Sequence, residues 1–175
     1  WWRDVFSSEE LDKLQEAAAK ATQEAKVGGE IIETSIRRSK VKFIFPDKEW
    51  GWVFKKLADL IARVNVDYYG FDITGFEEGI QLTSYEATDS GTYGWHQDFG
   101  GNGSPRKLSL VLQLSNPSEY EGGELELLVS KHPISVEKER GRVTIFPSWT
   151  LHQVTPVTKG NRQSLVVWVS GPEFK

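Results

Sequence analysis

The stretch 92–101, TYGWHQDFGG, places His96 two residues before Asp98, in a chain with only three histidines. Residues i and i+2 of a strand point to the same face, so both side chains can converge on one ion. Another histidine, His152, follows in the later stretch FPSWTLHQV. Two imidazoles and one carboxylate match the facial triad that holds non-haem iron(II) and leaves positions open for other ligands. A zinc hydrolase site would want one open position and often a general base.

Arg162 lies ten residues after His152, and Ser164, Val166 and Trp168 share its face if that strand is regular. The chain has no cysteine, which excludes disulfides and thiolate metal sites. The remaining histidine, His132, lies in the turn-like SKHPIS without an acidic partner at ligand spacing, so we expect a solvated loop residue.

The elements that must position these residues differ between the two halves of the chain. FSSEEL carries a capping box, with Ser7 as N-cap and Glu10 three residues later, and predicts a helix to about Lys26, ended by VGG at 27–29. Strands are predicted at 30–36 and 40–45, and the cluster of Arg37, Arg38 and Lys40 is expected at an exposed strand edge. A further helix is predicted after Asp47, with a buried face at three- and four-residue steps through residue 64.

From Gly79 onward, short strands alternate with turns rich in glycine, proline and asparagine. Eight short strands with this spacing predict a β-sandwich or jelly-roll barrel, against which the two helices would pack. The predicted strands are 80–86, 93–97, 107–115, 124–129, 134–136, 142–146, 151–156 and 162–170. The fold class is therefore mainly β with flanking helices, or α+β.

Length and composition limit the classes of protein further. The 175 residues carry a net charge of −4, with 38% hydrophobic and 26% charged residues, which suits one globular domain over 1–175. We expect helical support over about 1–78 and a catalytic core over about 79–170. No basic stripe is visible, so nucleic acid is a poor candidate partner. No leader and no run of about 20 apolar residues is visible, so no membrane partner is expected and a cytoplasmic location is predicted.

These residues carry a family resemblance. The chain resembles the iron(II)- and 2-oxoglutarate-dependent dioxygenases, especially the prolyl 4-hydroxylase branch, over residues 79–170. The matching residues are Tyr85, Tyr93, His96, Asp98, EYEGGELEL at 119–127, RVTIFPSWTLHQV at 142–154, Arg162 and Trp168. The resemblance implies a double-stranded β-helix, the cupin-like jelly roll already predicted from the strands.

The resemblance also implies roles for single residues. His96, Asp98 and His152 would bind iron(II), and Arg162 would bind the C5 carboxylate of 2-oxoglutarate, because a guanidinium meets a carboxylate in a two-pronged geometry. Ser164 would join that carboxylate and Tyr85 would lie beside the cosubstrate. Gln113 replaces a tyrosine of many relatives and could donate a hydrogen bond from the same place. The expected cavity wall and substrate contacts are Tyr93, Trp168 and Arg106.

The implied activity is hydroxylation of an unactivated C–H bond with oxygen, releasing succinate and carbon dioxide, with ascorbate as a candidate reductant. The leading substrate is a prolyl residue in a peptide or protein. The alternatives are a free amino acid or other small molecule, nucleic-acid demethylation, and a non-catalytic jelly-roll binding module. The demethylating branch normally carries a second arginine six residues after the first, where this chain has Trp168. A degenerate module would be expected to have lost one of the four site residues. The oligomeric state cannot be read from the sequence.

Overall fold

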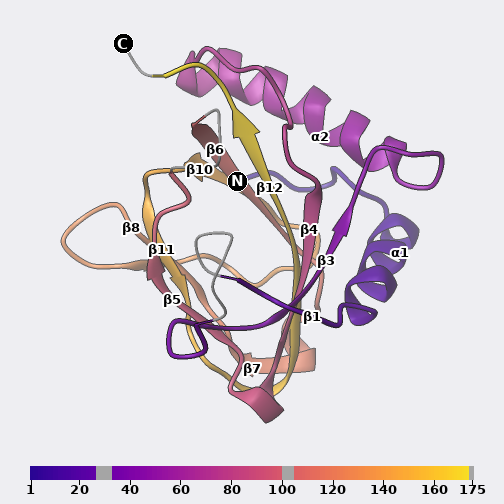
Figure 1. Cartoon of the computed structure of the whole chain (residues 1–175), viewed down its shortest axis with the longest axis vertical. Coiled ribbons are helices and arrows are strands. Elements are labelled where there is room, and N and C mark those ends of the chain that lie inside the picture. Colours follow the sequence, from indigo (N-terminus) through magenta and orange to yellow (C-terminus); the bar gives the residue numbers. More distant parts are fainter. Residues whose placement is uncertain (27–32, 100–104, 174–175) are drawn as a thin grey trace.

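The computed structural model describes residues 1–26, 33–99 and 105–173. Its strands form two antiparallel sheets that enclose the interior of a jelly roll, with the helices outside (Figure 1). The fold is therefore mainly β with flanking helices, as predicted. The larger sheet has the order β1 (Gln23–Glu24), β3 (Lys40–Ile44), β4 (Ile80–Glu86), β12 (Val157–Ser170), β6 (Arg106–Gln113) and β10 (Val143–Pro147), with β7 (Tyr120–Gly122) paired to β12. The smaller sheet has the order β2 (Arg37–Arg38), β5 (Thr92–His96), β11 (Leu151–Val154), β8 (Leu125–Leu128) and β9 (Ile134–Ser135).

Helix α1 (Ser8–Ala19) begins at the predicted capping box. The Ser7 hydroxyl accepts a hydrogen bond from Glu10 N at 3.3 Å, and the Glu10 carboxylate accepts one from Ser7 N at 2.8 Å. The predicted end near Lys26 is wrong, because α1 ends at Ala19. Residues 23–24 instead pair with β3, and interstrand hydrogen bonds replace those of further helical turns. The predicted stop signal at 27–29 lies outside the described residues.

Helix α2 (Gly51–Val64) follows Asp47, whose carboxylate accepts hydrogen bonds from Glu49 N and Trp50 N. The buried positions recur at three- and four-residue steps, as the amphipathic pattern predicts; they are Val53, Phe54, Leu57, Leu60, Ile61 and Val64. The chain continues as a π-helical turn, η1 (Asn65–Tyr69), which ends at the left-handed residue Gly70. These helical side chains join one large apolar cluster with the outer face of the larger sheet.

The strand predicted at 30–36 is corrected by the structure over its described part. Residues 34–36 form a turn, because Ile36 N and Arg37 N both donate to Glu33 O, and the Ser35 hydroxyl donates to the Glu33 carboxylate at 2.6 Å. Residues 30–32 lie outside the described residues. The local side-chain bond competes with extended structure, a common effect of serine near an acidic residue.

The predicted strands from residue 80 onward are present with shifted ends. The strands predicted at 151–156 and 162–170 are β11 and β12, and β12 begins five residues earlier than predicted, at Val157. Two single 3-10 turns, η2 (Ala87–Asp89) and η3 (Pro117–Glu119), fall at chain reversals. Strand β12 is central because it pairs with β4, β6 and β7.

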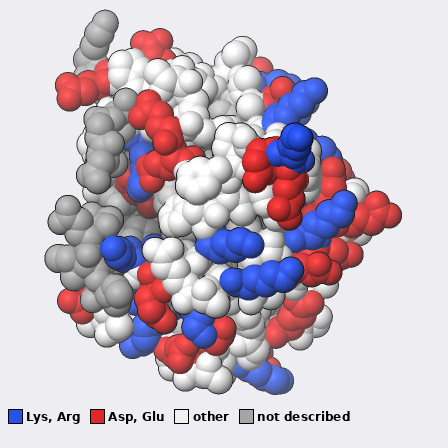
Figure 2. Space-filling view, turned by 45° about the vertical axis from the view of Figure 1, so that its right-hand side comes forward, with Lys and Arg blue, Asp and Glu red and all other residues white. Residues whose placement is uncertain are grey.

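Acidic and basic side chains are interspersed on the face shown in Figure 2, without a continuous basic surface. Among the residues that the structure describes, none of the helices has the length and apolar character needed to cross a membrane.

Candidate metal centre

The register of the smaller sheet brings two histidines together. Strands β5 and β11 are antiparallel neighbours, and His96 lies directly opposite His152 in their pairing. Their ring centroids are 4.1 Å apart. Directly opposite residues of an antiparallel pair have their side chains on the same face. A single strand pairing thus brings together two histidines that are more than fifty residues apart in sequence.

Asp98 lies two residues beyond the end of β5 and completes the cluster. Its Oδ1 is 3.7 Å from His96 Nε2, and its Oδ2 is 3.5 Å from His152 Nε2. Both separations exceed hydrogen-bond length and suit donor atoms arranged around a common ion. Asp98 is held by a bond from its own N–H to Ser148 O at 2.9 Å and by the Ser109 hydroxyl, which donates to Oδ2 at 2.7 Å. This supporting role of Ser109 was not predicted from the sequence.

Each imidazole is oriented by its second nitrogen. His96 Nδ1 lies 2.8 Å from Gly94 O, and His152 Nδ1 lies 2.8 Å from Thr150 O. A carbonyl can only accept, so Nδ1 carries the proton and Nε2 presents a lone pair to the centre. This arrangement of the second nitrogen is typical of metal-ligating histidines.

The electrostatics keep the donor atoms in the protonation state that a metal requires. Burial, helped by the neighbouring His152, lowers the pKa of His96 to about 4, against the opposing attraction of Asp98. Burial disfavours the charged form of Asp98, but the two imidazoles and the Ser109 hydroxyl outweigh it and hold the pKa of this carboxyl below its ordinary value. At neutral pH the cluster is therefore a carboxylate with a neutral His96.

The three donor atoms open into a cavity of about 590 Å³ between the sheets, a size that suits a small molecule or part of a peptide. Its lining includes nine of the ten residues selected from the sequence: Tyr85, Tyr93, His96, Asp98, Arg106, His152, Arg162, Ser164 and Trp168. The face-sharing prediction for β12 is confirmed, because Arg162, Ser164, Val166 and Trp168 all line this cavity.

Arg162 lies in the interior with 2% of its surface exposed. Its Nη1 donates to Ser164 Oγ at 3.4 Å, and its guanidinium lies 5.4 Å from the ring centre of Tyr85, its partner across the β12–β4 pairing. No acidic side chain within the described ranges forms an ion pair with it. Gly123, at φ +64°, leaves room for this side chain, since a Cβ there would lie 2.9 Å from Arg162 Cδ. A larger residue at this position, the second glycine of EYEGGELEL, would therefore collide with the Arg162 side chain.

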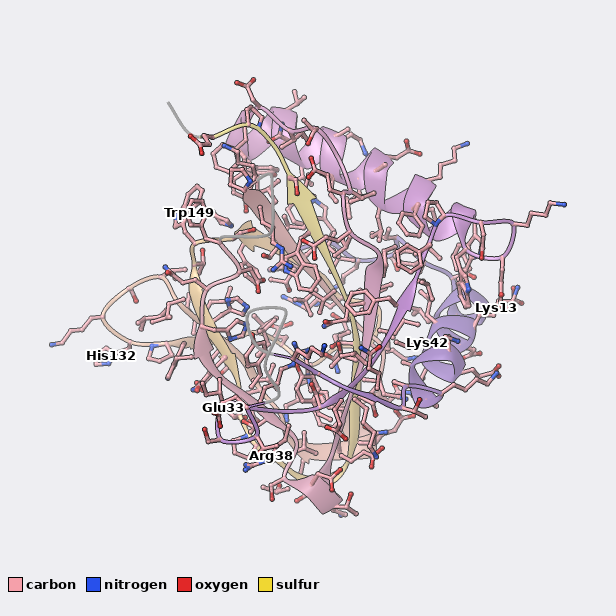
Figure 3. All side chains as sticks on the ribbon, in the orientation of Figure 1. Lys13, Glu33, Arg38, Lys42, His132 and Trp149 are labelled. Atoms are coloured by element: carbon pink, nitrogen blue, oxygen red, sulfur yellow. The ribbon has the colours of Figure 1, made fainter. Side chains whose placement is uncertain are left out.

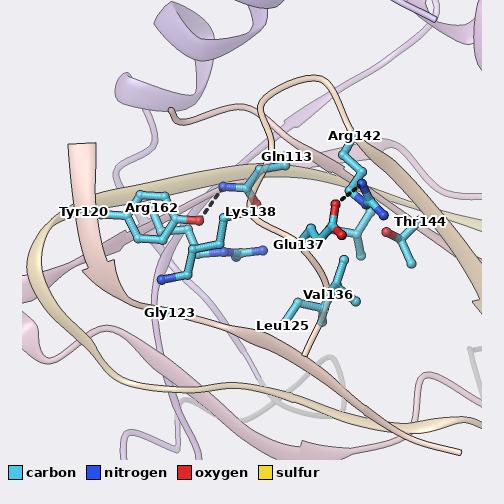
Figure 4. Close-up of a pocket in the computed structure, with 11 residues that line it drawn as sticks. Gln113, Tyr120, Gly123, Leu125, Val136, Glu137, Lys138, Arg142, Thr144 and Arg162 are labelled. Atoms are coloured by element: carbon cyan, nitrogen blue, oxygen red, sulfur yellow. Dashed lines mark hydrogen bonds and ion pairs between the residues drawn. The ribbon is translucent and has the colours of Figure 1, made fainter. Parts of the chain in front are cut away.

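Gln113 does not reach the large cavity. It lines a smaller hollow that Arg162 also lines, where its amide donates to the Tyr120 hydroxyl at 2.9 Å (Figure 4). Tyr120 precedes the two glycines of the matching motif and lies beside Arg162, whose charge acts against the rise that burial causes in the pKa of Tyr120. The role of Tyr120 was not predicted from the sequence, although its place before the glycine pair was a usable signal.

The mouth of the cavity has two arginines in different surroundings. Arg106 forms two hydrogen bonds with the Glu78 carboxylate, at 2.6 and 2.7 Å, and its guanidinium lies 3.9 Å from the ring centre of Trp168. Arg37 lines the same cavity and has 7% of its surface exposed. Strand β2 lies at the edge of the smaller sheet, as expected, but the expected exposure of Arg37 is wrong, because the pairing of β2 with β5 turns Arg37 inward over Tyr93. No local pattern distinguishes Arg37 from Arg38.

His132 lies outside the site. It occupies an exposed loop after β8, and its side chain projects away from the cluster (Figure 3). Within residues 1–26, 33–99 and 105–173, the group of three metal-ligating side chains is His96, Asp98 and His152.

The donor set fits iron(II) and 2-oxoglutarate on features of this chain alone. The two imidazoles and the carboxylate line one cavity with their ligand atoms within 4.8 Å of one another, the donor set of a facial triad. Arg162 supplies a buried cation that lacks a counter-charge in the described part of the chain. Such a group requires a partner when it is buried, and an anionic cosubstrate in this cavity would provide one for the guanidinium.

Comparisons with known proteins agree with this geometry. A family model described as the 2OG-Fe(II) oxygenase superfamily matches residues 80–170, more than half of the chain. A PKHD-type hydroxylase of Prochlorococcus marinus is 38% identical over 114 residues, covering 65% of this chain and 48% of that protein. A PKHD-type hydroxylase of Teredinibacter turnerae is 38% identical over 87 residues, covering 46% of this chain and 38% of that protein. The chain thus spans less than half the length of these curated relatives.

Solved structures show the same fold at low sequence identity. A prolyl hydroxylase of Trichoplax adhaerens, in complex with a hypoxia inducible factor oxygen degradation domain peptide fragment, superposes with a TM-score of 0.82 at 17% identity, over 97% of this chain and 82% of that one. A prolyl-4-hydroxylase of Pseudomonas putida gives a TM-score of 0.76 at 18% identity, over 98% of this chain and 91% of that one.

Proposed function

The chain belongs to the 2OG-Fe(II) oxygenase superfamily, and from this membership we propose that it is an iron(II)- and 2-oxoglutarate-dependent hydroxylase of unactivated C–H bonds. The observation that supports the proposal most strongly is the convergence of three ligand atoms within 4.8 Å of one another, in the same cavity as the buried Arg162. Three metal ligands without the buried arginine, or a buried arginine without the metal ligands, would be compatible with several other kinds of binding site.

In the proposed site His96, Asp98 and His152 bind iron(II), and Arg162 with Ser164 binds the C5 carboxylate of 2-oxoglutarate. When bound together with dioxygen, iron(II) and 2-oxoglutarate would supply oxidative decarboxylation to succinate and carbon dioxide, in which one oxygen atom of dioxygen enters succinate and the other is inserted into a C–H bond. The protein's own part is positioning. Ser109 fixes the Asp98 carboxylate, and the Gly94 and Thr150 carbonyls fix the two imidazoles.

The smaller hollow beside Arg162 has a supporting role in this proposal. Gln113 orients the Tyr120 hydroxyl, and Tyr120 packs against the guanidinium that meets the cosubstrate (Figure 4). The amide of Gln113 is committed to Tyr120, so its action on the cosubstrate is indirect. Tyr85, opposite Arg162 in the β12–β4 pairing, places its ring centre 5.4 Å from the guanidinium.

For the substrate we propose a prolyl residue in a peptide or protein. Two similarities support this proposal. The relatives by sequence include PKHD-type hydroxylases, and the structures with the same fold include a prolyl hydroxylase in complex with a peptide fragment. The rim also carries apolar side chains that a peptide could contact: Phe43 and Phe99 line the cavity and are 37% and 49% exposed. Nucleic acid is the weaker alternative, since the chain carries a net charge of −4 and has Trp168 where demethylating relatives carry a second arginine.

The test of the proposed function is spectroscopic and needs no substrate. Anaerobic addition of iron(II) and 2-oxoglutarate should produce a visible charge-transfer band, and the band should be absent in His96→Ala. His132→Ala is the matched control, because it removes the exposed histidine outside the site, and it should keep the band. A wild-type protein without the band would refute the assignment.

A further inference from the structure

Arg37 is a buried charged group in the cavity that the proposed chemistry leaves unused. We propose that Arg37 binds a carboxylate group of the substrate and so selects substrates that carry a negative charge close to the oxidised carbon. The inference rests on the proposed function and adds to it the chemical class of the substrate.

Strand pairing fixes the direction of this side chain. Strand β2 contains only Arg37 and Arg38, and Arg37 lies opposite Tyr93 of β5. Alternation along the strand sends the two arginines to opposite faces. Arg37 is buried against the cavity, whereas Arg38 projects toward the outside of the molecule, where its Nε donates to Ser90 O at 3.2 Å (Figure 3). The neighbour therefore provides a matched control.

The other charged groups of the cavity wall have assigned counter-charges, except Glu24 and Lys26, which are exposed to solvent. Arg106 is paired with Glu78 through two short hydrogen bonds. Asp98 faces the proposed metal, and Arg162 faces the proposed cosubstrate carboxylate. The polar partners of Arg37 among the described residues are neutral oxygens: Nε donates to Ser39 Oγ at 2.9 Å and Nη1 to Lys26 O at 3.5 Å. A buried guanidinium without a counter-charge is costly, so a ligand carboxylate there would be strongly favoured.

The distance of Arg37 from the metal site limits where that carboxylate lies in the substrate. The His96 ring stacks on Tyr93 with a centroid separation of 3.4 Å, and the Arg37 guanidinium lies 4.5 Å from the Tyr93 centroid. Because the imidazole covers one face of the phenol ring, the guanidinium occupies the other. From the His96 imidazole to the Arg37 guanidinium, the stack is roughly as long as two Cα–Cα steps of about 3.8 Å each. The carboxylate therefore belongs within about two residues of the oxidised carbon.

Three sources could supply such a group: a peptide C-terminus, an acidic side chain beside the proline, or the carboxylate of a free amino acid. Matched probe pairs separate them. The first pair is an acetylated glycine–proline dipeptide as the acid and as the amide. The second is the corresponding amidated tripeptide ending in aspartate or in asparagine. The third is free proline and prolinamide.

The experiment measures binding of each probe to the anaerobic protein with iron(II) and 2-oxoglutarate, by calorimetry and by the change in the charge-transfer band. In wild type, the acid of at least one pair should bind on the order of tenfold to a hundredfold more tightly than its amide, since a charge-assisted hydrogen bond is lost. In Arg37→Gln this preference should disappear, whereas Arg38→Gln should retain it. Arg37→Lys should retain part of the preference for the acid, because lysine keeps the positive charge but lacks the two-pronged hydrogen-bonding geometry of a guanidinium.

The outcomes separate the two proposals. Absence of the band in wild type would refute the proposed function. An intact band with equal binding of acid and amide in every pair, or with no binding of any acid, overturns the assignment of Arg37. The assignment also fails if Arg37→Gln weakens 2-oxoglutarate as much as it weakens the acid probe, because Arg37 would then serve the cosubstrate. A near-native melting temperature of Arg37→Gln shows that the variant is folded.

Discussion

The two faces of strand β12 differ in nearly every physical property. Leu165, Val167 and Val169 point outward to the helices and join the large apolar cluster. The alternate residues Arg162, Ser164, Val166 and Trp168 point inward and line the cavity. Strand β6 repeats the pattern, with three buried leucines on the helix side and Ser109 and Gln113 on the other. One set of strands therefore carries a stabilising face and a functional face.

The difference shows how the fold divides its tasks. The helix-facing side excludes water from aliphatic side chains and provides most of the hydrophobic stabilisation. The cavity-facing side buries Arg162, Asp98 and His152, groups that cost free energy unless they gain partners. Substitutions on one face should therefore change the stability of the metal-free protein, and substitutions on the other should change ligand binding.

The largest expected effect is on the helix-facing side. Leu57 of α2 is fully buried in the large cluster, so Leu57→Ala should lower the free energy of unfolding by about 2–5 kcal/mol through lost burial and a residual cavity. Urea denaturation of the metal-free protein measures this change. The exposed α2 residue Lys55 gives the control Lys55→Ala, which should cost little. The folded Leu57→Ala protein should still bind iron(II) and 2-oxoglutarate; weaker binding in the folded variant would contradict the division.

The next effect is on the cavity-facing side. Arg162→Met should weaken 2-oxoglutarate binding by roughly a hundredfold, because one partner of a charged pair is truncated. Iron(II) binding should change much less. The unfolding free energy of the metal-free protein should stay the same or rise, since the variant removes a buried charge that lacks a counter-charge in the described part of the chain. Calorimetry and urea denaturation test both claims; equal losses for iron(II) and 2-oxoglutarate would argue against an anchoring role.

Lowering the pH should reveal the free-energy cost of burying His96 on the cavity-facing side. The pKa of His96 is lowered from 6.5 to about 4 by burial, so between these pH values the unfolded chain binds more protons than the folded one. The unfolding free energy of the metal-free protein should fall by roughly 2–3 kcal/mol between pH 6.5 and 4. Urea denaturation across this range measures the slope. His96→Asn should flatten it, whereas His132→Asn at the exposed loop should not.

The smallest effect is at the start of α1. Ser7→Ala removes the hydroxyl of the capping box and should lower the unfolding free energy by about 1 kcal/mol. Ser8→Ala, one residue later on the exposed surface, is the control and should have little effect. Neither variant should alter the affinity for iron(II) or 2-oxoglutarate. A change in either affinity would show that the helices and the cavity are coupled.

The outward face could be predicted from sequence because its signals are local. The capping box at Ser7 and Glu10, the apolar steps of α2 and the alternation along β12 depend on neighbours within a few residues. The errors arose where partners were distant. Helix α1 ends at Ala19 because residues 23–24 pair with β3, and Arg37 is buried because β2 pairs with β5.

The sequence by itself determined the chemical types of the site: two histidines, one aspartate and one arginine, on segments whose period of two points them inward. Only the tertiary structure decided their distances and their neighbours. The β5–β11 register places His96 opposite His152, and β2 adds Arg37 to a cavity otherwise formed largely by later strands. The physical reason is that strand pairing joins segments far apart in sequence, and no local propensity specifies which edge pairs with which.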